Sequence, residues 1–395
     1  MKDLISIIIP CFNASQTISR TLKSLREQDY KKLEVIIIND GSTDNSLEII
    51  SKYQQFDNRI KVFSQKNMGV SVARNKGLEL ANGDYIIFLD ADDNYTSPFA
   101  ISKMMDKLKQ HDADMVVCNF IHPCFEIIMQ GEHIFNMEND NDFLKFYQDF
   151  FIIGVPWNKI IKKSCLTEKF IEGVKFNEDE LFNLDNLHNF KKIVFIDEVL
   201  HNYYCAPNSS SAVNSIYSSE NFWENKSTIW HLGMKNQELR IKSLTKFYPN
   251  KKSELQYVRS FDFFFWDFCL MLKNNVKKEY ILHTCKTIFE TQLFQQSLKH
   301  KERYGLKLQK ITDKQIVKFI NLARHAFIDI KSGNKTLSTI RVLLCLFYHC
   351  FFKAQNNLNP IDTLANAGKE FETSTSAEAF YSNFLVQMFK NKEIF

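Results

Sequence analysis

The chain has 395 residues, 45% hydrophobic and 24% charged, which is the composition of a globular protein long enough for two domains. Its net charge of +4 is too small to indicate a nucleic-acid partner. Nine cysteines without a C-x-x-C pair predict reduced, buried thiols and a cytoplasmic protein. The start of the chain does not resemble a signal peptide, and the apolar stretch 342–352 is about half as long as a bilayer-spanning helix.

The first 120 residues alternate short apolar runs with amphipathic windows. The expected strands are Ile5–Ile9, Leu33–Ile38, Ile60–Phe63, Tyr85–Leu89 and Met115–Phe120, and the expected helices between them are Ser15–Gln28, Leu47–Tyr53 and Val70–Leu80. This alternation predicts a Rossmann-like, mostly parallel α/β sheet. Ligands of such sheets bind beyond the carboxyl ends of the strands, so we expect the polar loops at these ends to form the site.

The rest of the chain is expected to complete this domain and add a second one. Helices are predicted at Asp142–Phe151 and Asp179–Phe190, and strands at Ile193–Ile196 and Val199–Tyr204. A polar loop over residues 208–211 closes the domain, which we place at residues 1–215. Residues 216–395 are expected to form an all-helical C-terminal domain.

Three acidic residues, Asp90, Asp92 and Asp93, follow the fourth expected strand. Two carboxylates one residue apart can both face a hard cation, which prefers oxygen ligands. Such a cation can neutralise the charge that develops on a departing nucleoside diphosphate. The alternative is an acidic turn that caps the helix beginning near Pro98.

Five segments resemble the family 2 glycosyltransferases, which have the GT-A fold. The segments, in the order of the family, are SIIIPCFNASQTISRTLKSLREQDY, EVIIINDGSTDNSLEII, KNMGVSVARNKGLELANGDYIIFLDADD, WNKIIKKSCL and FNEDELFNLDNL. Each segment is a weak signal alone, but five at the expected spacings are specific. The resemblance implies a nucleotide-sugar donor and covers residues 4 to about 190.

The resemblance also implies roles for donor-site residues. Pro10 and Phe12 would line the base pocket, Asp40 would bind uracil or an equivalent base, Asn67 and Arg74 would contact the nucleotide, Asp90 with Ala91 would lie at the ribose or metal, and Asp92 would be the main ligand of Mn²⁺ or Mg²⁺. The residues themselves leave alternatives open. Asp40 before Gly41 fits a turn cap, and Arg74 fits a surface salt bridge as well as a phosphate contact.

A second acidic group, Glu178 and Asp179, precedes an expected helix. By resemblance Asp179 is the general base that takes the proton of the acceptor hydroxyl, with Glu178 beside it, which predicts inversion of configuration. The alternative is a negatively charged first turn that interacts favourably with the helix dipole.

Three further positions leave the sequence interpretation open. His201, at a strand end, fits either a structural role or a contact with the metal or diphosphate. Trp157 fits either the acceptor side or the protein core. Many relatives carry an arginine that helps the leaving diphosphate where this chain has Tyr204 and Cys205, so we expect that help from the metal, His201 or another basic residue.

The sequence therefore predicts an inverting, metal-dependent glycosyltransferase. It would move a hexose or N-acetylhexosamine from a UDP-linked donor to a glycan or lipid-linked glycan acceptor, in capsule, lipopolysaccharide or related synthesis at the inner face of the membrane. The alternatives are a sugar nucleotidyltransferase on a related fold and a non-catalytic glycan-binding protein. The basic stretch Lys299–Lys318 fits a solvated helix face or an anionic membrane surface, and the C-terminal helices fit a core, a homo-oligomer contact or a membrane-surface anchor.

Overall fold

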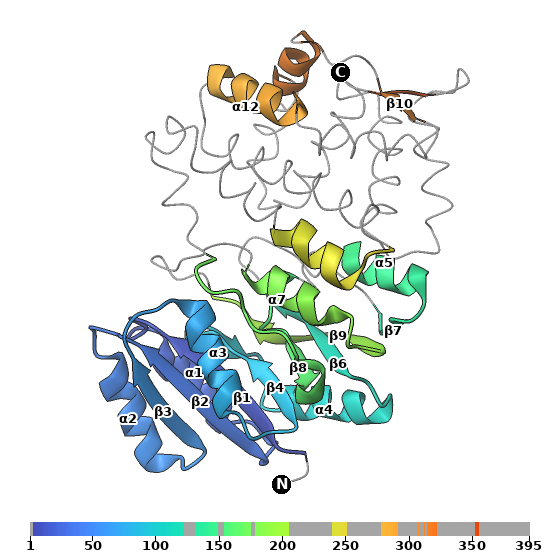
Figure 1. Cartoon of the computed structure of the whole chain (residues 1–395). Helices are drawn as coiled ribbons and strands as arrows, with labels where there is room; N and C mark the ends of the chain where they lie inside the picture. The colour runs from blue at the N-terminus through green and yellow to red at the C-terminus, as the bar shows by residue number, and fades with distance from the viewer. Residues whose placement is uncertain are drawn as a thin grey trace, which may run out of the picture. The chain divides into compact units, whose positions relative to one another are not determined.

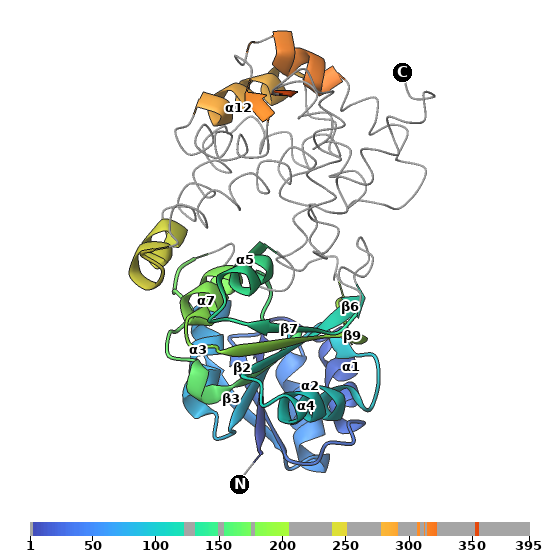
Figure 2. The ribbon, with the colours of Figure 1, turned by 90° about the vertical axis from the view of Figure 1, so that its right-hand side faces the viewer.

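The computed structural model describes residues 3–121, 131–148, 154–174, 178–204, 239–250, 278–290, 306–308, 312, 314–321 and 352–354. By its internal contacts the chain divides into two compact units. Unit 1 comprises Met1–Ser209 and Glu238–Tyr248, and unit 2 comprises Ser210–Gln237 and Pro249–Phe395. Figures 1 and 2 show the strands and helices of unit 1 from two directions.

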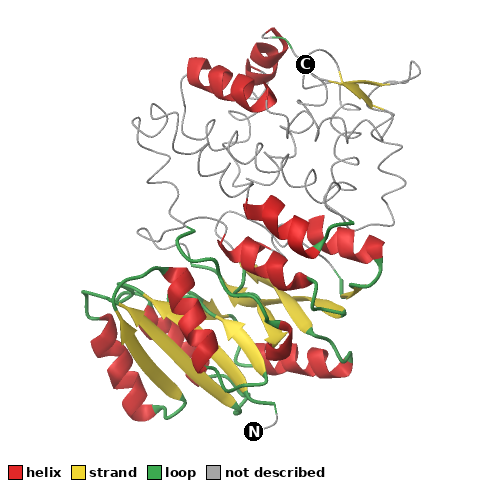
Figure 3. Ribbon diagram, viewed as in Figure 1, coloured by secondary structure: helices red, strands yellow, loops and turns green. Residues whose placement is uncertain are grey.

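Unit 1 alternates strands and helices along the chain (Figure 3). Its strands are β1 (Ile5–Cys11), β2 (Leu33–Asp40), β3 (Ile60–Gln65), β4 (Tyr85–Phe88), β5 (Asn94–Tyr95), β6 (Met115–Ile121), β7 (His133–Asn136), β8 (Lys159–Lys162) and β9 (Lys192–Asn202). Its helices are α1 (Ile18–Arg26), α2 (Ser46–Phe56), α3 (Val70–Leu80), α4 (Ala100–Gln110), α5 (Asp140–Gln148), α7 (Glu178–Leu187) and a helix over residues 239–247.

Nine strands of the described residues form one mixed sheet, in the order β3-β2-β1-β4-β8-β6-β9-β5, with β7 paired to β9. The first four strands are all parallel, and β6 is parallel to β9, whereas β8, β7 and β5 pair antiparallel with their neighbours. The Rossmann-like α/β fold predicted from the sequence is therefore confirmed, with its all-parallel part in the first 90 residues.

Alternation along the strands explains why helices cover both faces. Ile5, Ile7 and Ile9 of β1 pack on one side with apolar residues of α1, α2 and α4. Ile8 points to the other side, where Phe88, α3 and α7 complete a second cluster. Strands buried on both faces read as nearly continuous apolar runs, which is why the sequence located β1 and β2 so closely.

Two expectations about the later part of unit 1 need correction. The strands predicted at Ile193–Ile196 and Val199–Tyr204 are one strand, β9, because Asp197 and Glu198 continue it across a register shift against β6. Unit 1 also takes in the helix over residues 239–247, which the sequence placed in the C-terminal domain.

In unit 2 the structure describes α12 (Lys278–Glu290), a helix over residues 314–321, and the strands β10 (Leu306–Leu308) and β11 (Phe352–Ala354). The two strands pair antiparallel, in a region that the sequence predicted to be helical throughout. Most of the basic stretch Lys299–Lys318 and the loop over residues 208–211 lie outside the described residues. Across the described parts of the chain, no helix combines the length and apolarity needed to span a bilayer.

Candidate functional site

The site is built where parallel strands end at one edge of the sheet. The loops after β1 and β2 are tied together there: the backbone N–H of Asn13 donates to the Ser42 hydroxyl at 3.0 Å, and the Asn13 side-chain oxygen accepts from the Thr43 N–H at 2.8 Å. Phe12, in the loop after β1, is 50% exposed. An exposed aromatic ring beside these connected loops can stack on a planar ligand, and the base-pocket role of Pro10 and Phe12 stays a prediction.

Asp40, at the end of β2, organises the neighbouring loop. Its carboxylate oxygens accept from the N–H groups of Met68 at 2.9 Å and Gly69 at 2.8 Å, and from the Gln65 side chain at 2.8 Å. Gly41 has a positive φ of 74°, and a Cβ added there would lie 2.7 Å from the backbone nitrogen of Asn67. Asp40 thus shapes the loop that carries the exposed Asn67, and both of its oxygens already accept hydrogen bonds from the chain.

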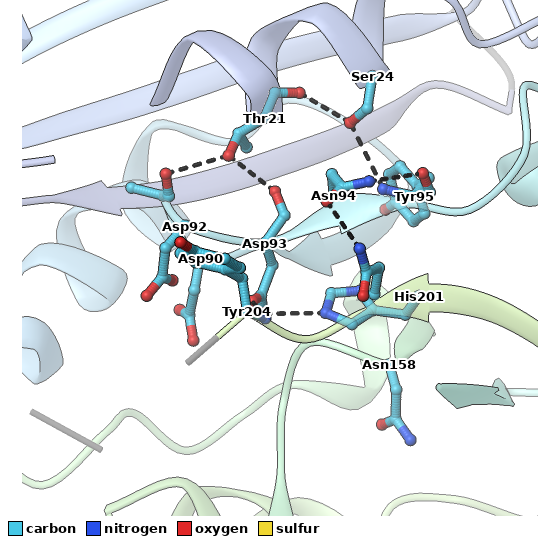
Figure 4. A network of polar contacts seen from close by, with 12 residues as sticks. Thr21, Ser24, Asp90, Asp92, Asp93, Asn94, Tyr95, Asn158, His201 and Tyr204 are labelled. Atoms are coloured by element: carbon cyan, nitrogen blue, oxygen red, sulfur yellow. Dashed lines mark hydrogen bonds and ion pairs between the residues drawn. The ribbon is translucent and has the colours of Figure 1, made fainter. Parts of the chain in front are cut away.

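The acidic loop after β4 is held in place by α1. The Thr21 hydroxyl lies 3.0 Å from the carbonyl oxygen of Ala91 and 2.7 Å from that of Asp93, and the Arg20 guanidinium donates to the carbonyl oxygen of Asp92. In Figure 4 the side chains of Asp90 and Asp92 point to the same side of this loop. Burial, and then the negative charges of Asp90 and Asp93, raise the pKa of Asp92 to about 7.

This loop fits a divalent cation whose other ligands come from the substrate. Repulsion among carboxylates that raises a pKa is relieved when a cation binds between them. Within the described residues no group of three His, Cys, Asp or Glu side chains is arranged to hold a metal. Mg²⁺ is commonly held by one or two carboxylates together with substrate phosphates, and Asp90 and Asp92 supply such a pair.

His201 is engaged inside the protein. Its Nε2 lies 2.9 Å from a carboxylate oxygen of Asp93, and both side chains are 0% exposed. The other oxygen of Asp93 accepts from the backbone N–H of Tyr204 at 2.8 Å. Trp157 stacks on the imidazole at 4.4 Å and is itself buried. Burial lowers the pKa of His201 to about 3 and raises that of Asp93.

These contacts favour the structural interpretations of two residues. The proposed metal contact of His201 is not formed in this arrangement, because Nε2 faces Asp93 and the imidazole is buried. Trp157 lies in the core rather than on a surface open to an acceptor. The sequence missed Asp93 as the partner of His201, although its place in the acidic run was a usable signal.

Arg74 joins the two acidic groups of the sequence. On α3 and only 4% exposed, its guanidinium lies 3.0 Å from Asp90, 2.6 Å from Asp179 and 3.2 Å from Glu178. Asp90 and Asp179, which are 89 positions apart in the sequence, are thus brought to one cation. The arginine is occupied by carboxylates, which corrects the interpretation of Arg74 as a surface salt bridge and leaves its phosphate contact unsupported by the geometry.

Asp179 lies in an environment suited to a base. Burial raises its pKa well above the usual value, against the opposing effect of Arg74, and the side chain keeps 20% exposure. A carboxylate whose pKa is moved toward neutrality accepts a proton more readily at neutral pH.

The helix of Asp179 is anchored on its far side. Glu180 forms a buried ion pair with Arg240 at 2.6 Å, each side chain being 3% exposed, and the Tyr248 hydroxyl donates to the Leu184 carbonyl oxygen at 2.9 Å. Both partners belong to the segment 238–248. No local sequence pattern indicates this anchor, because its ion pair joins residues 60 positions apart.

Comparison with known proteins gives consistent results. A sequence model described as "Glycosyl transferase family 2" matches residues 6–157. Glycosyltransferase GlyG of Streptococcus pneumoniae is 30% identical over 225 residues, which are 51% of this chain and 71% of that protein. The uncharacterized glycosyltransferase EpsJ of Bacillus subtilis is 30% identical over 54% of this chain and 64% of its own length.

A third relative aligns over most of the chain. The cholesterol galactosyltransferase of Borreliella burgdorferi is 26% identical over 347 residues, which are 83% of this chain and 95% of that protein. The Bacillus and Streptococcus alignments, by contrast, cover only about half of this chain.

Proposed function

Because the chain belongs to glycosyltransferase family 2, we propose that it transfers a hexose or N-acetylhexosamine from a UDP-linked donor to a hydroxyl of a glycan or lipid-linked acceptor, with inversion. The observation that carries this proposal is the cluster at Arg74. One guanidinium holds Asp90, from the donor loop, and Asp179, from the expected acceptor side, within 3.0 and 2.6 Å. Inverting transfer needs two things in one site: groups that neutralise the negative charge on the leaving diphosphate, and a base for the acceptor hydroxyl.

Each residue has a distinct task in this proposal. Phe12 stacks on the base, and the loop organised by Asp40 borders it. Asp90 and Asp92 hold Mn²⁺ or Mg²⁺, which supplies charge neutralisation for the leaving diphosphate. Asp179 takes the proton from the acceptor hydroxyl as its oxygen attacks the anomeric carbon from the face opposite the diphosphate.

One relative that aligns over most of both chains supports a lipid as the acceptor. The Borreliella protein is described as a cholesterol galactosyltransferase, and cholesterol is a lipid with a hydroxyl group. A hydroxyl on a lipid or lipid-linked glycan is therefore the acceptor class we propose to test first.

The decisive experiment separates donor binding from proton transfer. Thermal unfolding is measured with UDP and UDP-sugars, with and without Mn²⁺, since binding to the folded state raises the midpoint. Transfer and the anomeric configuration of the product are then followed by NMR. We expect Asp179→Asn to keep the UDP-dependent rise in midpoint and to lose transfer by about 10²–10⁴-fold.

Asp185→Asn is the matched control, because Asp185 lies on the same helix and contacts Ser243. It should keep transfer. Equal loss in both variants would assign a structural effect to α7, and retention of configuration in the product would refute the direct-displacement mechanism. If no nucleoside diphosphate or nucleotide sugar changes the unfolding midpoint, the protein is not a donor-dependent transferase.

A further inference from the structure

Arg20 lies beside the acidic loop that follows β4. It projects from α1, its guanidinium sits 3.9 Å from the centre of the Tyr204 ring, and it donates to the carbonyl oxygen of Asp92. The residue is exposed, unlike Arg74. Tyr204 itself is fixed, because its backbone N–H donates to the buried Asp93.

The charge of Arg20 is available to a ligand. Among the described residues no carboxylate side chain lies within ion-pair distance of Arg20, whereas Arg74 has three. A guanidinium carries five N–H donors in a planar fork, and the bond to the Asp92 carbonyl uses one of its nitrogens. Stacking on an aromatic ring fixes the plane of such a fork while leaving its edge open to a partner.

The neighbouring loop needs such a cation when a donor binds. Asp90, Asp92 and Asp93 are three acidic side chains, and a donor diphosphate adds further negative charge to them. A divalent cation and Arg74, which Asp90 shares with Glu178 and Asp179, leave negative charge uncompensated at this loop when the diphosphate binds. Arginine pairs with phosphate oxygens through two parallel hydrogen bonds, which suits the diphosphate and the charge that it gains on leaving.

We propose that Arg20, held by Tyr204, binds the diphosphate of the nucleotide donor and stabilises it as the leaving group. This inference rests on the proposed function, and it assigns to α1 the cation that the sequence lacks at Tyr204 and Cys205. Tyr204 is a positioning residue: its ring orients the guanidinium and does not contact the phosphates.

The test compares ligands that differ only in their phosphates. Calorimetric dissociation constants for UDP, UMP and uridine with Mn²⁺ are measured on wild type, Arg20→Gln, Arg20→Lys and Tyr204→Leu. We expect Arg20→Gln to weaken UDP binding about 10–100-fold, the loss of a charge-assisted contact, and to leave uridine binding unchanged. Arg20→Lys should recover part of the affinity, and Tyr204→Leu should shift it in the same direction as Arg20→Gln.

Arg26→Gln is the control, because Arg26 is exposed on the same helix, in its last turn. It should bind UDP like wild type. The inference is overturned if Arg20→Gln leaves UDP binding unchanged, or weakens UDP and uridine equally, which would indicate a structural effect of the loop. If the wild type binds UDP and transfers sugar, and Arg20→Gln does both equally well, this inference alone is refuted. A wild type that binds no nucleoside diphosphate refutes the proposed function and this inference together.

Discussion

Arg74→Met is predicted to destabilise the protein strongly, because it leaves three acidic side chains facing one another without their cation. The guanidinium is 4% exposed, and its partners Asp90, Glu178 and Asp179 are 13–26% exposed. Removing one partner of a buried ion pair typically costs about 3–5 kcal/mol. For a domain of this size that corresponds to a fall of roughly 6–20 °C in the unfolding midpoint.

The loss is predicted to depend on pH. Burial already raises the folded-state pKa of Asp179 above the ordinary 3.8, and Arg74 opposes this effect, so the pKa rises further in the variant. A carboxyl with a raised folded-state pKa holds more protons in the folded than in the unfolded protein, so stability falls as the pH rises from the unfolded to the folded pKa. The difference between wild type and variant should therefore be small near pH 4 and large near pH 8.

The measurement is thermal and denaturant unfolding of both proteins at pH 4.5, 6 and 8. Arg74→Met/Asp179→Asn should recover part of the stability at pH 8, since one of the uncompensated charges is gone. Lys52→Met is the control: Lys52 pairs with Glu48 at 2.7 Å, and because the two side chains are 65% and 64% exposed, we expect the midpoint to stay close to that of wild type. An unchanged midpoint for Arg74→Met at pH 8, or the same loss at every pH, would refute the electrostatic reasoning.

Three other predictions concern Arg240, Gly77 and Asp92. Arg240→Met should lower the free energy of unfolding by about 3–5 kcal/mol, because it removes one side of a buried ion pair with Glu180. Glu180→Gln/Arg240→Met should recover part of that loss. Denaturant titration measures both variants, and an effect below about 1 kcal/mol for Arg240→Met would contradict the prediction. Gly77→Ala should destabilise by about 1–3 kcal/mol, because its Cβ would lie 2.2 Å from Ile8; an unchanged midpoint would show that β1 yields. Asp92→Asn should stabilise the metal-free protein by about 1–3 kcal/mol at pH 8 but not at pH 4. The folded-state pKa of Asp92, about 7, exceeds the ordinary 3.8, so the wild type loses stability as the pH rises from 3.8 to 7 and the carboxyl becomes charged. Mn²⁺ should reduce this difference, and a variant less stable than wild type at pH 8 without metal would contradict the prediction.

Periodicity and motif spacing located the first half of the domain well. Strands covered on both faces, such as β1 and β2, are apolar along their whole length, and their ends are marked by polar loops. The sequence also singles out Asp90 and Asp179 as candidates, because each stands at the end or start of a regular element. In both cases the signal is local.

The pairings that build the site are not local, and the sequence could not supply them. The Asp93–His201 contact spans 108 residues, and nothing near His201 distinguishes a carboxylate partner from a metal. The prediction of two separate strands in place of β9 was wrong for a related reason. Asp197 remains in the strand because it accepts from the side chain of Asn119 and the N–H of Gly131, which are distant in sequence.

The anchor at Glu180 has a consequence for the order in which the protein forms on the ribosome. Arg240 is synthesised 60 residues after Glu180, an interval of roughly 3–12 s at ordinary translation rates. During that time the helix that carries Asp179 has been synthesised, but the ion pair between Glu180 and Arg240 cannot form. The catalytic unit should therefore reach its final packing only after residue 248 has emerged, and a nascent chain arrested before that point should expose α7 to protease.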